Sequence, residues 1–174
     1  MEDKGAVPGD GEELSAGELE ILRDEAEERD EGPASKEERL SLKIGKLTVG
    51  EKIRVSLRAG KEVRGLLMKD SNKQVVLGVI ANPKITVSEV EMAARMRSIP
   101  EEALRQISRN REWVKNYDVV HNLVVNPKTP AGVAVGLLPR MRAKDLAFIQ
   151  KNKEIPDAVR TAAKKLTAAR NKNR

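Results

Sequence analysis

The chain contains the same twelve-residue pattern twice, and the two copies lie 44 residues apart. One copy runs from Val75 to Thr86 and the other from Val119 to Pro130. In each copy the first, second, fifth and sixth positions are apolar, which is the spacing of one face of a helix. Asn-Pro follows and ends the helix, because the residue before a proline is disfavoured in the α region.

A weaker match relates Arg109–Glu112 to Lys151–Glu154, 42 residues apart. A unit of 42–44 residues that holds several short helices is typical of repeat proteins whose helices stack. The sequence therefore predicts an all-α fold, namely a short α-solenoid-like array of helices. The alternative is one irregular helical domain in which the duplication arose by chance.

Signals for helix starts recur along the same region. The pattern Ser/Thr-x-x-Glu/Gln, in which two side chains cap the first turn, occurs at Ser35–Glu38, Thr48–Glu51, Ser71–Gln74, Thr86–Glu89 and Ser98–Glu101. Pro100 and Pro130 are expected in first turns, where a missing N–H costs nothing. Together these signals predict helices over residues 36–46, 48–59, 61–69, 72–81, 87–96, 99–109, 112–116, 118–125, 130–138, 143–151 and 156–170.

Charge is divided unevenly along the chain. Residues 1–39 have a net charge of −10, whereas residues 40–174 have a net charge of +16. Residues 1–34 are rich in Gly, Pro and acids and are expected to form an acidic, mostly disordered tail. A short helix over 16–29 is expected inside this tail, because Ser15–Glu18 has the form of a capping box. The helical repeat domain is expected over 35–170 and a basic tail over 171–174.

The alternation of helix, Asn-Pro-x-Thr and helix resembles the HEAT-like and leucine-rich-repeat-variant helical repeat proteins of bacteria. The resemblance covers about residues 61–166, with two clear copies of the Asn-Pro signal. It implies a helical scaffold used for binding, and it brings no catalytic residues.

Residues 52–72 allow a competing β interpretation. Lys52–Leu57 alternates polar and apolar residues, and Gly60, Gly65 and Asn72 follow at positions typical of turns. This order is similar to the first motif of Sm-like RNA-binding barrels, and Val and Ile favour strands. Against it, Thr48–Glu51 begins a helix, the alternation is short, and the second Sm-like motif is absent downstream.

Few residues are suited to catalysis or to holding a cofactor. The chain has no cysteine and a single histidine, His121. One imidazole does not make a zinc site or a Ser-His-Asp triad, and there is no Gly-rich phosphate loop. Glu101 and Glu102 lie in the first turn of an expected helix, where the helix dipole explains them. We therefore expect a non-enzymatic protein with no metal, no cofactor and no catalytic residues.

No apolar run approaches the length of about 20 residues that a membrane-spanning helix needs. The acidic start, Met1-Glu2-Asp3, is not typical of a secretory signal. We therefore expect no integral membrane association and a cytoplasmic location. Attachment of the basic C-terminal helix to a membrane surface is the weakest option, because its apolar face is poor.

Basic side chains recur in clusters near the ends of the predicted helices and are the main functional signal. Equivalent positions line up in a stacked array, so these side chains are expected to form a basic ridge. Trp113 and Tyr117, four residues apart, are expected on one helix face, where they could stack. The alternative for these two residues, and the favoured one, is packing in the core or between helices. The alternative for the basic clusters is solvated helix faces and charge complementation at helix C-termini. The candidate partner-binding residues are Arg95, Arg97, Arg105, Arg109, Arg111, Trp113, Lys115, Arg140, Arg142, Lys144, Lys151 and Lys153.

Two functions suit such a ridge. In the first, the protein is an interaction or scaffold module that presents the ridge to an acidic protein segment. Its own acidic tail is then either a second contact for the partner or an internal competitor for the same surface. In the second, it is a sequence-nonspecific nucleic-acid-binding protein that uses the ridge for phosphates. The first is favoured, because single-strand binding normally adds stacking aromatic side chains and this chain has few.

Overall fold

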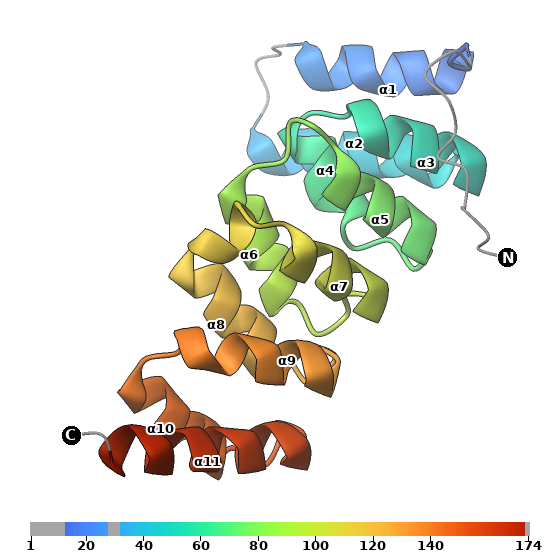
Figure 1. Ribbon diagram of the computed structural model, residues 1–174. Helices are drawn as coiled ribbons and strands as arrows, with labels where there is room; N and C mark the ends of the chain where they lie inside the picture. Colours follow the sequence, from blue (N-terminus) through green and yellow to red (C-terminus); the bar gives the residue numbers. More distant parts are fainter. Residues whose placement is uncertain (1–12, 28–31, 173–174) are drawn as a thin grey trace, which may run out of the picture. The chain divides into compact units, whose positions relative to one another are not determined.

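The computed structural model describes residues 13–27 and 32–172, and within these ranges 74% of residues are helical and none is in a strand. The chain divides into two compact units, one ending at Lys84 and the other beginning at Ile85. The prediction of an all-α array of helices is confirmed (Figure 1). Of the tail that was predicted to be mostly disordered, residues 1–34, positions 1–12 and 28–31 lie outside the described residues. The short helix expected over 16–29 is formed over Ala16–Ala26.

In the first unit the helices are α1 (Ala16–Ala26), α2 (Pro33–Gly45), α3 (Val49–Arg58), α4 (Lys61–Leu67) and α5 (Lys73–Ala81). In the second they are α6 (Val87–Arg95), α7 (Glu101–Arg109), η1 (Trp113–Lys115), α8 (Tyr117–Val125), α9 (Ala131–Leu137), η2 (Leu138–Arg140), α10 (Ala143–Lys151) and α11 (Asp157–Lys172). The labels η1 and η2 denote single 3₁₀ turns. The Sm-like interpretation is wrong, because residues 52–72 lie mainly in α3 and α4.

Three predicted capping boxes are formed, and both reciprocal hydrogen bonds are present in each: Ser15–Glu18, Thr48–Glu51 and Thr86–Glu89. They begin α1, α3 and α6. Since a cap satisfies backbone N–H groups that have no partner inside the helix, these side chains fix where each helix starts.

The other three expected caps are wrong, namely Ser35, Ser71 and Ser98. Pro33 begins α2 two residues before Ser35, because its fixed φ already suits the first turn. Asn72 caps α5 in place of Ser71, and its side chain accepts from the Gln74 amide. Pro100 and Pro130 are themselves the N-cap residues of α7 and α9, one position before the predicted first turn.

The repeated pattern has a structural counterpart in both units. Its apolar positions are buried: Val75, Val76, Val79, Ile80, Val119, Val120, Leu123 and Val124. They lie on α5 and α8, which pack against α3 and α6 respectively. Each unit therefore contains a three-helix repeat, α3–α4–α5 in one and α6–α7–α8 in the other, in which the third helix covers the first.

The asparagine of the repeated Asn-Pro is a buried clip between the first and third helices. Asn82 Nδ2 donates to the carbonyls of Ser56 (2.8 Å) and Ala59 (3.1 Å) at the end of α3. Asn126 Nδ2 donates in the same way to Ala94 (2.8 Å) and Met96 (3.0 Å) at the end of α6. These bonds satisfy carbonyls that a helix end leaves unpaired.

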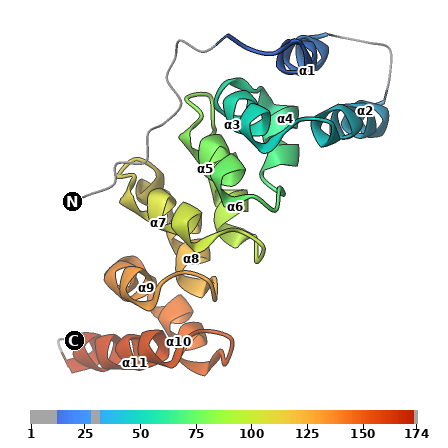
Figure 2. The same cartoon turned by 90° about the vertical axis from the view of Figure 1, so that its right-hand side faces the viewer.

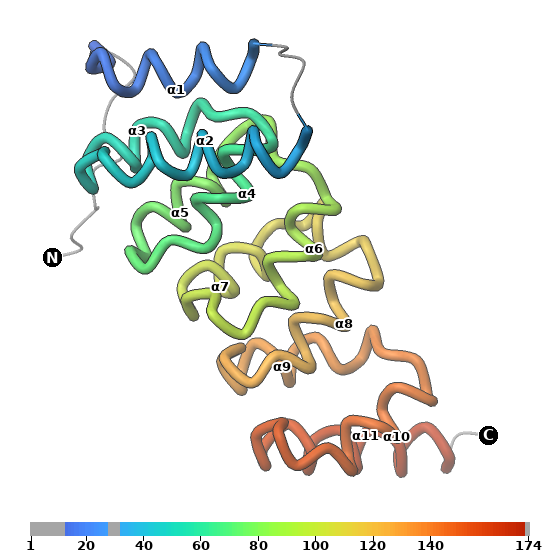
Figure 3. The backbone as a smooth tube through the Cα atoms, turned by 180° about the vertical axis from the view of Figure 1, so that it is seen from behind, coloured from blue at the N-terminus to red at the C-terminus, as the bar shows by residue number. Residues whose placement is uncertain are grey.

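The weaker repeat also has a shared geometry. Asn110 ends α7 and Asn152 ends α10. The two side chains accept from the amides of Glu112 and Glu154, each at 3.0 Å. In the second unit α9–α10–α11 therefore forms another three-helix repeat, whose last two helices pack along each other (Figure 3).

Candidate functional site

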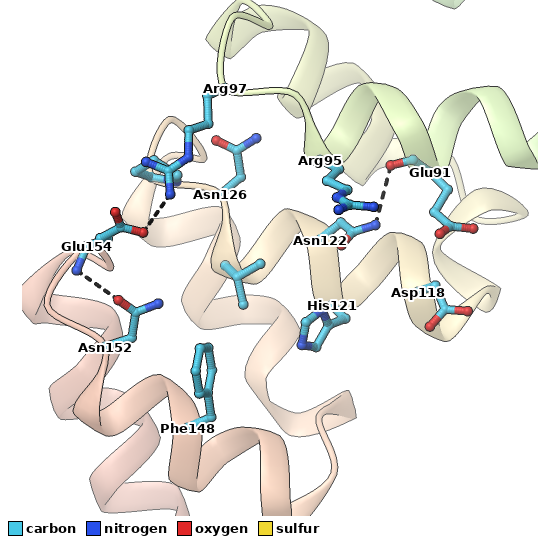
Figure 4. Close-up of a pocket in the computed structure, with 12 residues that line it drawn as sticks. Glu91, Arg95, Arg97, Asp118, His121, Asn122, Asn126, Phe148, Asn152 and Glu154 are labelled. Atoms are coloured by element: carbon cyan, nitrogen blue, oxygen red, sulfur yellow. Dashed lines mark hydrogen bonds and ion pairs between the residues drawn. The ribbon is translucent and has the colours of Figure 1, made fainter.

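The second unit contains a groove of about 510 Å³. It is lined by the end of α6, the exposed side of α8, the end of α10 and the loops that follow these helices. Figure 4 shows the side chains that face it. The lining residues used below are Glu91, Arg95, Arg97, Asp118, His121, Asn122, Phe148, Asn152 and Glu154.

The asparagine clip positions the two arginines of the groove. Asn126 holds the carbonyls of Ala94 and Met96, which directly flank Arg95 in sequence. Arg95 is the last residue of α6 and Arg97 follows in the loop after it, so the clip fixes the backbone from which both guanidinium groups extend.

Asn122 occupies the position on α8 that Gly78 occupies on α5, 44 residues earlier. A Cβ on Gly78 would overlap the Ser56 hydroxyl, so α5 lies closely against α3. Asn122 instead carries an amide into the groove, where its Nδ2 lies 3.4 Å from the carbonyl oxygen of Glu91. This replacement adds a polar group to the second unit at a point where the first unit is tightly packed.

The groove has an ion pair at one end and carboxylates at the other (Figure 4). At one end, Arg97 donates to Glu154 at 2.6 Å, and both side chains are exposed. Their hydrogen bond raises the pKa of Arg97 and lowers the pKa of Glu154. At the other end lie the carboxylates of Glu91 and Asp118. The groove therefore suits a ligand with charges of both signs and not a uniformly acidic one.

Arg95 and Phe148 both line the groove and are both exposed. Arg95 is exposed and makes no ion pair within residues 13–27 and 32–172. Phe148 is the single phenylalanine of the chain, and 55% of it is exposed. Exposed aromatic and guanidinium side chains that line one groove are typical of residues that contribute strongly to protein–protein binding.

The other predicted residues do not line this groove. Arg105 pairs with Glu101 and Lys115 with Glu112 within the same helix or turn. Six more are exposed, and their side chains make no ion pair within the described part of the chain: Arg109, Arg111, Arg140, Lys144, Lys151 and Lys153. Lys151 and Lys153 flank Asn152 and so stand next to the groove in sequence. A single basic ridge through all twelve positions stays a prediction.

Trp113 and Tyr117 do not stack along one helix face, which was the less favoured of the two interpretations. Trp113 is half-buried in the 3₁₀ turn η1, whereas Tyr117 begins α8, so the two do not share a helix face. The Tyr117 ring instead lies beneath the Arg142 guanidinium, 4.1 Å from its carbon, and 6.3 Å from the His121 ring.

The Tyr117 hydroxyl donates to the Asp145 carboxylate and accepts from the Arg142 backbone amide at 3.1 Å. Burial and the bond to Asp145 raise the pKa of Tyr117. This contact between α8 and the start of α10 was not predicted, because Tyr117 and Asp145 are separated by 28 residues and no motif links them. It holds Arg142 against an aromatic face.

Within the described residues, no group of three or more His, Asp or Glu side chains is placed to hold a metal ion. No helix among those residues is long and apolar enough to cross a membrane. No protein-family model matches the chain, and searches of curated proteins and of solved structures returned no match. The resemblance to bacterial HEAT-like and leucine-rich-repeat-variant proteins therefore stays a prediction.

Proposed function

We propose that the protein is a non-enzymatic interaction module that binds an extended segment of another protein in the groove of its second unit. The observation that carries this proposal is the meeting of Arg95, Arg97 and Phe148 in one groove. Cations and an aromatic ring there match the acidic and apolar side chains of a peptide.

The mixed charge of the groove gives the bound segment a direction. Its acidic side chains belong at the end with Arg97, where they compete with Glu154 for the guanidinium. Asn152 at that end is flanked in sequence by Lys151 and Lys153. Glu91 and Asp118 at the other end favour a neutral or basic residue. The amide groups of Asn122 and Asn152 combine donor and acceptor atoms, so they suit the backbone of such a segment.

Selection of a peptide library displayed on phage against the full chain tests the proposal. Selected peptides are expected to combine acids with an apolar residue. Their affinity is then measured for the double variant Arg95→Glu/Arg97→Glu, which reverses both groove cations. A loss of about tenfold or more is expected, the scale of removing residues that dominate an interface.

The chain supplies a matched control in Arg109→Glu/Arg111→Glu. It has the same Arg-x-Arg spacing, the same change of net charge and two exposed side chains outside the groove. Peptide affinity is expected to fall far less in this variant. Equal losses in both double variants contradict a site in the groove, because they indicate attraction to net charge alone.

Binding of nucleic acid is the other outcome to be measured. Phe148 is the one Phe, Tyr or Trp side chain among the groove-lining residues, whereas single-strand binding normally uses several stacking rings. A gel-shift titration with single-stranded and duplex oligonucleotides at two salt concentrations is expected to give weak binding. Tight binding that falls steeply with salt contradicts the peptide proposal and supports the phosphate-binding alternative.

A further inference from the structure

Helix α1 lies on α2 and α3 in the first unit (Figures 1 and 2). The face that it buries is mostly charged. Its buried residues are Glu18, Ile21, Asp24 and Glu25. Carboxylates are almost never buried unless they are paired, and only one of these four side chains is apolar. The contact is therefore built on matched charge more than on apolar packing.

The N-terminal half of α1 binds α3. The Glu18 carboxylate is fully buried and accepts from Arg54 Nε at 2.8 Å and Nη2 at 3.3 Å. Burial alone raises the pKa of Glu18, but the bonds from Arg54 and Ser15 outweigh it and leave the pKa lowered. Ser15 Oγ donates to Glu51 at 2.6 Å and adds a second link to α3.

The C-terminal half of α1 binds α2 and the start of α4. Asp24 pairs with Lys43 at 2.9 Å and with Arg39. Glu25 accepts from the backbone amides of Gly60 (2.6 Å) and Val63 (2.9 Å). A Cβ on Gly60 would lie 2.8 Å from this carboxylate, so the glycine leaves room for it.

An isolated helix of 11 residues is marginal in water, so α1 depends on this surface for its structure. Glu18 and Asp24 of α1 pair with Arg39, Lys43 and Arg54, none of which is among the candidate partner-binding residues. The tail helix thus already occupies a basic surface, but one in the first unit.

We propose that the surface formed by α2, α3 and the start of α4 is a binding site for acidic helices, and that α1 is its resident occupant. The partner is a helix of another protein that repeats the spacing Ser-x-x-Glu-x-x-Ile-x-x-Asp-Glu of Ser15–Glu25. Such a helix makes the same contacts and takes the place of α1. This site is independent of the groove in the second unit.

A fluorescein-labelled peptide of residues 13–27 tests the proposal with full-length protein. In the wild-type chain the tethered α1 competes at a high effective concentration, so the peptide binds weakly. The variant Glu18→Gln/Asp24→Asn weakens its own α1. Fluorescence anisotropy is expected to show that this variant binds the peptide about tenfold or more tightly than the wild type does.

Two controls separate this result from unspecific attraction. A peptide that carries the same Gln and Asn substitutions is expected to bind the variant chain much more weakly than the natural peptide. The Cβ that Gly60→Ala adds would overlap the Glu25 carboxylate of α1 and the equivalent carboxylate of the peptide. A chain with this substitution is expected to bind the peptide weakly even when it also carries Glu18→Gln/Asp24→Asn.

Circular dichroism establishes that each variant remains folded before binding is compared. Equal affinity of folded wild-type and Glu18→Gln/Asp24→Asn chains overturns the proposal, because α1 then does not occupy the peptide's site. The proposal is also overturned if the wild-type chain forms a concentration-dependent dimer that the peptide dissociates. In that case the occupant of the surface is the α1 of a second copy of the chain.

Discussion

Asn82 and Asn126 each use both ends of one amide in a buried position. Besides the two bonds from Nδ2, the Oδ1 atoms accept from the amides of Lys84 (2.8 Å) and Lys128 (3.0 Å). No other side chain of that length offers two donors and an acceptor in one plane. The proline that follows keeps the asparagine out of the helix, so its side chain can reach across to the first helix of the repeat.

The variant Asn126→Ala is expected to destabilise the second unit. It leaves the carbonyls of Ala94 and Met96 without this donor. An unsatisfied buried polar group lowers the free energy of unfolding by about 1–3 kcal/mol. Urea unfolding followed by the fluorescence of Trp113, the single tryptophan, measures the loss. The control is Asn152→Ala, which removes one bond at a half-exposed site and is expected to cost less. Equal costs contradict the role of the clip.

Acid is expected to weaken the first unit through Glu51. Hydrogen bonds from Ser15 and Thr48 lower the pKa of Glu51 from 4.5 to about 2. Because the folded-state pKa is lowered, the stabilisation is present above pH 4.5 and is lost as the pH falls toward 2. In the variant Glu51→Gln the urea midpoint, followed by circular dichroism, should fall less over this interval than in the wild type. Parallel pH profiles would contradict the assignment.

The spacing of α3 and α5 depends on a glycine. The variant Gly78→Ala is expected to destabilise the protein by about 1–3 kcal/mol, because its Cβ meets Ser56 and the well-packed pair must separate. Gly65→Ala is the control, since nothing lies within 4 Å of its Cβ and alanine favours a helix. Urea denaturation measures both variants. The prediction is contradicted if Gly78→Ala leaves the free energy of unfolding unchanged while Gly65→Ala raises it, because α3 and α5 then move apart without loss of stability.

The elements themselves could be predicted from sequence, because their signals are local. Caps such as Thr48 and Thr86, and breaks such as Asn82-Pro83, act within four residues of the helix end. The choice of Asn72 over Ser71 was missed because both residues are good caps. Lys52–Leu57 is helical despite its strand-like alternation, because the Thr48 cap and the packing of α3 against α5 outweigh β propensity.

The sites could be predicted only in part, because they combine residues that are distant in the chain. Glu18 and Arg54 are 36 residues apart, and nothing in an acidic tail indicates which base it meets. The clustering of basic residues predicts a binding role for Arg95 and Arg97, whereas no pattern in the sequence predicts one for Phe148 or His121. Which face of α10 stays open depends on the packing of its neighbours, and no local pattern encodes that.

At the scale of the whole molecule, the net charges of the two units have opposite signs. The unit ending at Lys84 has 15 basic and 18 acidic residues, a net charge of −3, whereas the unit beginning at Ile85 has 18 basic and 9 acidic residues, a net charge of +9. Long-range attraction of an anionic partner follows net charge. The second unit is therefore the one expected to capture such a partner first.

Hydrogen–deuterium exchange with a heparin oligosaccharide as the anionic probe checks this expectation. Protection is expected in peptides from residues 85–172 and not in those from residues 13–27 and 32–84. High salt should abolish it, because exposed charges are screened. Protection centred on α3 and α4 instead would show that local basic residues outweigh net charge.

The asparagine clip also sets where a repeat can vary in length. The clipped carbonyl and its asparagine are 26 residues apart for Ser56 and Asn82, but 32 residues apart for Ala94 and Asn126. The contact between first and third helices is kept although the second copy is longer by six residues, which include the turn η1. The middle of each repeat is thus a natural place to graft an epitope or a reporter sequence.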